Sequence, residues 1–244
     1  MRPRGSRPAA LLLTAFLLAP VAVIALPASV AADPVTFHAA DGTRLDASWF
    51  PPPRPAPAVL LLHMLTRSHR EWDPAIPRLR EAGFGVLALD YRGHGHSGGT
   101  WTTGLSALQQ DVQAALNWLK ARPDVLPGRI GIAGSSIGST LAVIAAGTDS
   151  SVRSIALVSP ATEYRDLRCT PAMRRFADRS GAALLIAAAD DPYAVRSARS
   201  LAAVTPGLRE LRVIEGTAAH GARLFAVRPD LPMLLVDWFL RTLL

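Results

Sequence analysis

The sequence contains a single cysteine, Cys169, and a single lysine, Lys120. One thiol cannot form an intramolecular disulfide, so folding does not depend on oxidation, and Cys169 is expected to be a small buried hydrophobic residue. The other basic residues are arginines scattered along the chain, and the formal net charge is +7. Because nucleic-acid binding needs clustered as well as excess positive charge, no nucleic-acid partner is predicted.

Sequence signatures of bound cofactors are also missing. The chain has no phosphate-binding P-loop, so no nucleotide cofactor is predicted. His94 and His96 form a closely spaced pair, but no set of Asp, Glu or His residues at metal-ligand spacing accompanies them. Metal centres generally use three or four such ligands. No metal site is therefore predicted, and the pair is interpreted as part of a structural loop.

The longest apolar run of the chain lies near its N-terminus. Three arginines among the first seven residues precede an apolar stretch over 9–26, and small residues follow it. This order is typical of a secretory signal peptide, and Pro20 favours cleavage over the alternative of an uncleaved membrane anchor. We predict a signal peptide over 1–32 and a mature single domain over 33–244, secreted or periplasmic and without a stable membrane span after cleavage.

From residue 58 onward, short apolar runs alternate with longer amphipathic ones. This alternation predicts an α/β fold, with a mostly parallel central sheet and helices on both faces. Before it, Asp41-Gly42 lies between two strand-like runs and predicts an N-terminal antiparallel hairpin. We expect parallel strands at 58–63, 85–89, 130–133, 155–159, 183–188 and 211–214, and helices at 71–81, 105–120, 139–146, 166–177, 194–204 and the end of the chain.

The segment around which the chain is organised is Gly134–Gly138, a G-x-S-x-G pattern with Ser136 at its centre. An apolar run over 130–133 precedes it, and a run that starts with capping residues follows, as expected of a strand, a sharp turn and a helix. Such a turn lifts a serine hydroxyl above the sheet, and flanking glycines let neighbouring backbone pass closely. Ser136 is the candidate nucleophile. A Gly/Ser-rich turn without reactivity is the alternative.

A serine hydroxyl needs a base to take its proton, and the base needs a third group to orient it. Of the six histidines, only His220 follows Ser136, and it lies in the loop after the expected strand at 211–214. The loop after the strand at 183–188 supplies two acids, Asp190 and Asp191. Because ligand sites of open parallel sheets lie at the carboxyl ends of the strands, we expect His220 and one of these acids near Ser136.

Five segments stand out along the chain, each next to an expected strand. They are Leu61-Leu62-His63-Met64, Leu89-Asp90-Tyr91-Arg92-Gly93-His94-Gly95-His96-Ser97, the serine turn, Asp190-Asp191-Pro192 and Ala219-His220-Gly221. They resemble signatures of the α/β-hydrolase family, in the family's order and over essentially the whole mature length. The resemblance is to serine esterases, with dienelactone hydrolase-like and prolyl oligopeptidase-like members, and serine, acid and histidine also follow in the family's order.

The resemblance implies roles for individual residues. The family's G-x-x-D-P loop places the acid at Asp191, although Ala188 stands where glycine is usual, and Asp190 remains the alternative. In the family, two backbone N–H groups form the oxyanion hole, one after the nucleophile and one after the first parallel strand. These are implied here to be the N–H groups of Ile137 and Met64, although the family often has glycine at the second position.

The function implied by the resemblance is hydrolysis of small-molecule carboxylic esters through a Ser-His-Asp triad and an acyl-enzyme intermediate. His63 is interpreted as a support of its loop. One helix is expected between 159 and 183, which leaves no room for a large lid domain. A prolyl oligopeptidase-like peptidase or amidase is the alternative enzyme, but such peptidases usually carry a large extra domain. A catalytically silent binding protein is a further alternative, against which the complete triad argues.

Overall fold

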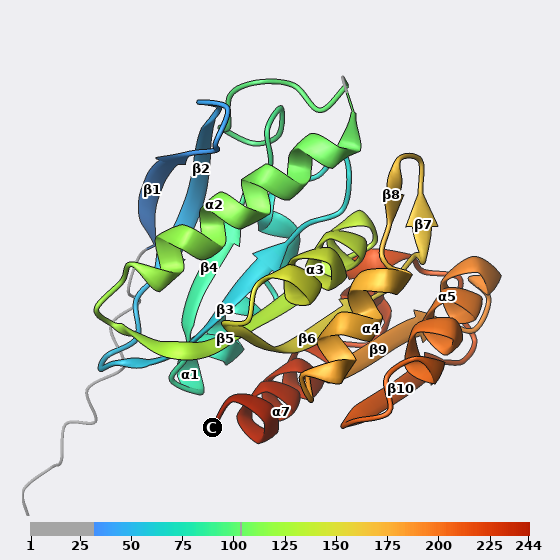
Figure 1. Ribbon diagram of the computed structural model, residues 1–244. Coiled ribbons are helices and arrows are strands. Elements are labelled where there is room, and N and C mark those ends of the chain that lie inside the picture. Colours follow the sequence, from blue (N-terminus) through green and yellow to red (C-terminus); the bar gives the residue numbers. More distant parts are fainter. Residues whose placement is uncertain (1–31, 103) are drawn as a thin grey trace, which may run out of the picture. The chain divides into compact units, whose positions relative to one another are not determined.

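A computed structural model of the chain describes residues 32–102 and 104–244. The predicted signal peptide therefore lies, apart from Ala32, outside the described residues. The described part is built on an eight-stranded sheet with helices on both faces (Figure 1). The predicted α/β-hydrolase fold is confirmed, with a mostly parallel sheet, an N-terminal antiparallel hairpin and no large separate domain in the described ranges.

Two antiparallel pairings stand at one edge of the sheet, and the rest of it is parallel. The order of strands across the sheet is β1-β2-β4-β3-β5-β6-β9-β10. The pairs β1–β2 and β2–β4 are antiparallel, and every other neighbouring pair is parallel. The strands are β1 (Asp33–His38), β2 (Arg44–Phe50), β3 (Ala56–Leu62), β4 (Gly85–Leu89), β5 (Val125–Ser135), β6 (Val152–Val158), β9 (Ala182–Ala188) and β10 (Arg209–Ile214).

Helices cover the two faces in two groups, each with its own hydrophobic core. One face carries α2 (Leu108–Lys120), which a short 3₁₀ turn, η2 (Leu105–Ala107), precedes, together with α3 (Ile137–Thr148), α4 (Thr170–Asp178) and α5 (Pro192–Ala203). The other face carries α1 (Ile76–Glu81), α6 (Leu224–Val227) and the C-terminal α7 (Leu231–Leu243). In the ranges that the structure covers, no helix has the length and apolar character that a membrane crossing requires.

Alternation along the strands separates the two cores. In β3, Leu60 and Leu62 belong to the core under α2 to α5, whereas Val59 and Leu61 belong to the core under α1, α6 and α7. All four side chains are fully buried. A central parallel strand with helices on both faces has to be apolar on both, which explains why this strand is a continuous apolar run rather than an alternating one.

Two of the predicted helices differ from the structure. The helix expected over 71–81 is divided into η1 (His69–Trp72) and α1, with Pro74 in the break. Proline has no N–H to donate, so the pattern of helical hydrogen bonds is interrupted at this position. The helix expected over 166–177 starts later as α4, because β7 (Glu163–Tyr164) and β8 (Leu167–Arg168) form a small separate hairpin.

Candidate active site

Ser136 stands at the junction between β5 and α3, as the sequence predicted. Its backbone has φ +54 and ψ −115, a conformation that costs a non-glycine residue free energy and that is typical of functional turns. The Ser136 N–H donates to the carbonyl of Val158 on β6 at 2.8 Å. The side chain of Ser139 donates to the carbonyl of Gly134 at 2.6 Å and braces the turn from inside. The serine is thus held in a strained turn at the end of a buried strand.

The two glycines of the motif are required by close backbone contacts. A Cβ at Gly134 would lie 2.3 Å from the carbonyl oxygen of Gly138. A Cβ at Gly138 would lie 2.2 Å from the carbonyl oxygen of Leu62 on β3. Both distances are far below van der Waals contact, so the backbones can approach only where no side chain intervenes.

His220 and Asp191 lie beside Ser136 in a continuous hydrogen-bonded chain. The Nε2 atom of His220 is 2.8 Å from Ser136 Oγ, and its Nδ1 atom is 2.5 Å from Asp191 Oδ2. The His220 side chain is 38% exposed and that of Asp191 is 14% exposed. These contacts allow a proton to pass from the Ser136 hydroxyl to the His220 imidazole. The Asp191 carboxylate fixes the tautomer of His220 that carries hydrogen on Nδ1.

Of the two neighbouring acids, Asp191 is the one that contacts His220. Its other oxygen, Oδ1, accepts from the N–H of Ala194 at 3.2 Å and caps the start of α5. Asp191 can make both contacts because its two oxygens face different groups. Asp190 is exposed.

A pocket of about 260 Å³ opens beside the Ser136 hydroxyl. Its walls combine the turn residues with the β7–β8 hairpin and the start of α5. The residues that line it are Leu65, Ser136, Ile137, Pro160, Ala161, Tyr164, Tyr193 and His220. The lining contains no Asp, Glu, Lys or Arg side chain among the described residues, so the pocket suits an uncharged group.

The two predicted oxyanion donors differ in how their N–H groups are placed. Ile137 is the first residue of α3, where the backbone N–H has no partner within the helix, and it lines the pocket with Ser136. The N–H of Met64, in contrast, donates to Glu71 Oε1 at 2.8 Å. The expectation for Met64 therefore does not hold in this structure, because a carboxylate already occupies the N–H that was to stabilise the oxyanion.

The next residue, Leu65, is better placed to donate. It lines the pocket beside Ser136, whereas the N–H of Thr66 donates to His94 Nε2 at 3.1 Å. Among the described residues, the Leu65 N–H has no hydrogen-bond partner, unlike those on either side of it. The N–H that remains available is therefore one residue further along the chain than the sequence indicated, since the direction of each N–H in a short loop depends on its hydrogen-bond partners.

Two buried histidines support this loop. His63 donates from Nδ1 to the Met64 carbonyl at 2.7 Å, and its Nε2 accepts from the Tyr91 N–H at 3.3 Å. Burial lowers the pKa of His63 to about 4, so the ring is neutral near pH 7. His94 donates from Nδ1 to the Arg92 carbonyl at 3.0 Å, so both of its nitrogens are engaged with backbone. These contacts agree with the interpretation of both histidines as loop supports.

Three polar residues near the site escaped the sequence analysis. Ser135 Oγ accepts from the N–H of Ala222 at 2.9 Å, and Ser159 Oγ accepts from the N–H of Gly221 at 2.9 Å, so both hold the loop that carries His220. Glu71, the third, contacts Met64. Ser135 occupies a variable position of the G-x-S-x-G pattern, Ser159 belongs to no recognisable motif, and Glu71 lies in a stretch that was expected to be an amphipathic helix.

Comparison with known proteins connects this geometry to a family and to solved hydrolases. The model of the family described as X-Pro dipeptidyl-peptidase (S15 family) matches residues 41–202. The esterase Pf2001 of Pyrococcus furiosus has a similar structure, with a TM-score of 0.73, 21% identity and coverage of 87% of this chain and 91% of that one. A dienelactone hydrolase from Anabaena variabilis has a TM-score of 0.69, with 18% identity and coverage of 87% and 98%. At these identities the likeness shows the fold alone.

Relatives found by sequence similarity match a smaller share of this chain than the solved structures do. The uncharacterized protein YfhR of Escherichia coli O157:H7 is 37% identical over 142 residues, which are 54% of this chain and 49% of YfhR. YfhR of Salmonella typhi is 29% identical over 212 residues, 80% of this chain and 66% of its own length. Epoxide hydrolase B of Mycobacterium tuberculosis is 44% identical over 57 residues, 23% of this chain and 16% of that protein. The chain spans about half the length of the Escherichia coli relative.

Proposed function

Because the chain belongs to the X-Pro dipeptidyl-peptidase (S15) family and is thus a hydrolase of the α/β-hydrolase fold, we propose that it cleaves carboxylic esters with Ser136 as nucleophile. The observation that carries the proposal is the continuous contact from Ser136 Oγ through His220 to Asp191, at 2.8 and 2.5 Å. A serine, a histidine and a carboxylate in this geometry are the machinery of acyl transfer.

In the proposed reaction, His220 Nε2 takes the hydroxyl proton as Ser136 Oγ forms a bond to the acyl carbon. The carbonyl electron pair moves onto oxygen, and the N–H groups of Ile137 and Leu65 stabilise the resulting oxyanion. The pair then returns, the bond to the alcohol breaks, and the alcohol leaves with the proton from His220. Water repeats the sequence and releases the acid, with Asp191 holding the imidazole throughout.

Two features favour an ester over an X-Pro dipeptide as the substrate. A dipeptidyl peptidase has to bind a free, positively charged amino terminus, which is normally done by carboxylates. The pocket beside Ser136 has no carboxylate among the described residues that line it, and its apolar walls suit an uncharged acyl or alcohol group. The family description keeps a peptidase or amidase as the second candidate.

A matched substrate panel tests the proposal. Esters and anilides of the same acyl group should differ by at least about 100-fold in kcat/KM in favour of the ester, and a fluorophosphonate probe should label wild type but not Ser136→Ala. Fast cleavage of an X-Pro anilide with little ester activity would favour the peptidase. Equal probe labelling of Ser136→Ala would mean that another serine is the nucleophile.

A further inference from the structure

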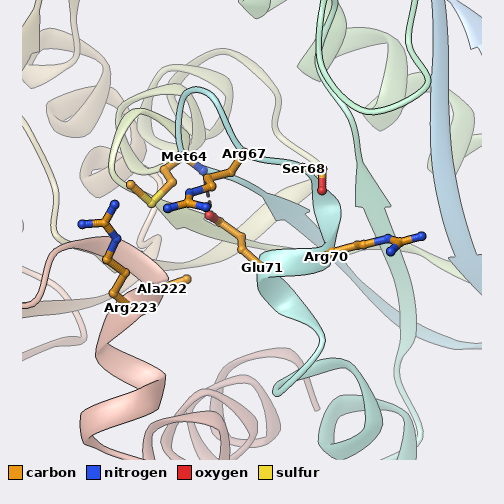
Figure 2. A pocket seen from close by; sticks show the side chains of 7 residues that line it. All are labelled: Met64, Arg67, Ser68, Arg70, Glu71, Ala222 and Arg223. Carbon is orange, nitrogen blue, oxygen red and sulfur yellow. Dashed lines mark hydrogen bonds between the residues drawn. The ribbon is translucent and has the colours of Figure 1, made fainter.

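Glu71 is a half-buried residue with a carboxyl group that the proposed mechanism does not use. It lies in η1, beneath the loop that carries Met64, and its Oε1 atom accepts from the Met64 N–H at 2.8 Å (Figure 2). Its Oε2 atom is buried and has no hydrogen-bond partner among the described residues. An oxygen in this position is costly for the fold, which calls for an explanation in terms of function.

The surroundings of Glu71 connect it to the loops of the candidate active site. It lines a pocket of about 380 Å³ with Met64 and Ala222, and the Ser135 side chain, one residue before the nucleophile, helps to stabilise its ionised form. Ser135 Oγ in turn accepts from the Ala222 N–H at 2.9 Å, two residues beyond His220. The Glu71 carboxyl group therefore lies between three segments of the candidate site: the loop that carries Met64 and Leu65, the turn that carries Ser136 and the loop that carries His220.

Charged and titratable groups surround this carboxyl group. Arg67 comes from its own segment and Arg223 comes from η3 (Gly221–Arg223) on the opposite side of the pocket, whereas the Arg70 side chain points away from the carboxyl group (Figure 2). Tyr91, which follows β4 by two residues, is fully buried and has a pKa raised by burial and by the charge of Glu71. Burial raises the pKa of Glu71 itself to about 7, against the opposing effects of the Met64 N–H, Ser135 and Arg67.

We propose that Glu71 is a positioning residue for the reaction at Ser136: its ionised carboxylate holds the Met64 N–H and so leaves the next amide, that of Leu65, to stabilise the oxyanion. The inference rests on the proposed function. A charge-assisted hydrogen bond is roughly twice as strong as a neutral one, so the loop is held more firmly when Glu71 is ionised. The Met64 N–H donates to Glu71 and the Thr66 N–H donates to His94. The Leu65 N–H between them has no acceptor among the residues that the structure describes.

The proposal predicts a pH dependence that His220 alone does not give. Ionisation of Glu71 is expected to give a rise in activity centred near pH 7. Glu71→Gln keeps an acceptor for the Met64 N–H but carries no titratable proton. In the ratio of kcat/KM between wild type and Glu71→Gln, the contribution of His220 cancels and that of Glu71 remains.

The experiment measures kcat and KM for one activated ester between about pH 5 and 9, for wild type, Glu71→Gln, Glu71→Ala and a control. The wild-type to Glu71→Gln ratio should rise by about 3- to 10-fold through pH 7 and then level. Glu71→Ala should lose about 10- to 100-fold in kcat with KM within about 2-fold, since oxyanion stabilisation acts in the transition state. The control, Glu81→Gln, changes a glutamate on α1 that is 3.0 Å from Arg78, and its ratio should be flat.

The outcomes separate the two proposals. A flat wild-type to Glu71→Gln ratio, or a Glu71→Ala defect confined to KM, overturns the role of Glu71 and leaves the nucleophile untouched. Retained activity in Ser136→Ala overturns the proposed function itself. If Glu71→Ala fails to fold by circular dichroism, the Glu71→Gln ratio still decides, because glutamine has the same shape and keeps the acceptor.

Discussion

The position of a single side chain determines which of two neighbouring carboxylates contacts His220. Asp190 and Asp191 are adjacent and chemically identical, yet only Asp191 places an oxygen 2.5 Å from His220 Nδ1. Pro192 directly after it disfavours the helical conformation at Asp191, whose backbone has φ −109 and ψ 80. Its second oxygen bonds to the N–H of Ala194, which fixes the carboxylate at both ends.

The first prediction compares the two acids directly. Asp191→Asn should lower kcat by about 10³- to 10⁴-fold, because the amide cannot hold the imidazole in the tautomer that accepts the serine proton. Asp190→Asn should change kcat by less than about 3-fold, since its side chain is exposed. Steady-state kinetics on one ester, after confirmation of folding, measures both. A severe loss in Asp190→Asn alone would reverse the assignment.

The second prediction concerns the stability contributed by Glu71. Its pKa is raised from 4.5 to about 7 in the folded chain, so between these values the native state binds more protons than the unfolded state. Stability attributable to Glu71 is therefore full below about pH 4.5 and is lost as pH rises through 7. Relative to Glu71→Gln, wild type should lose up to about 3 kcal/mol over this window, as measured by urea unfolding. A difference in stability that does not vary with pH would contradict the buried position of the carboxyl group.

At the scale of elements, the contact between β3, β5 and α3 sets the position of the nucleophile. The third prediction is that Gly138→Ala destabilises the protein by about 3 kcal/mol or more, because the new Cβ would meet the Leu62 carbonyl oxygen at 2.2 Å. Gly207→Ala is the control: its Cβ would have no neighbour nearer than 3.8 Å, so its cost should stay within about 1 kcal/mol. Thermal unfolding of both variants measures the difference, and equal losses would contradict the packing argument.

The β7–β8 hairpin is the element that shapes the pocket. Tyr164 on β7 lines the pocket, and Tyr193 on α5 lines it too while donating from its hydroxyl to the Glu163 carbonyl at 2.6 Å. The hairpin is therefore attached to α5 across the mouth of the pocket. Loops and short insertions of this kind commonly set specificity while a rigid sheet holds the chemistry.

The fourth prediction follows from that placement. Tyr164→Ala should raise the ratio of kcat/KM for a longer acyl ester over its shorter homologue by about 10-fold, because it removes a wall of a pocket of about 260 Å³. Arg168→Ala on the same hairpin should leave the ratio within about 2-fold, since this exposed side chain does not line the pocket. An unchanged ratio in Tyr164→Ala would place the acyl group elsewhere.

At the scale of the whole molecule, we propose that the chain is exported. The basic start and the apolar stretch over 9–26 support the proposal. The fifth prediction is that intact mass of the protein from the periplasm or medium of an expressing cell begins at Ala32 or Asp33. Recovery of the full-length chain in washed membranes would show an uncleaved anchor instead.

The sequence by itself determined the class of fold and the kinds of residue at the site. Apolar runs of strand length alternate with helical ones, and this pattern allows little besides a sheet with helices on both faces. Ser136 was identified from the G-x-S-x-G pattern and His220 as the only histidine after it, and both lie beyond the ends of expected strands, which gather at one edge of a parallel sheet. Their proximity in the structure follows from that topology, while their catalytic roles stay predictions.

Only the tertiary structure decided which backbone and side-chain atoms meet. The Met64 N–H is not available to an oxyanion because Glu71, seven residues further along the chain, folds back under the loop and accepts it. The β7–β8 hairpin replaced the start of an expected helix, and its tie to Tyr193 joins segments 30 residues apart. Local patterns carry information about period and burial, whereas the direction of one N–H depends on a partner that the pattern does not contain.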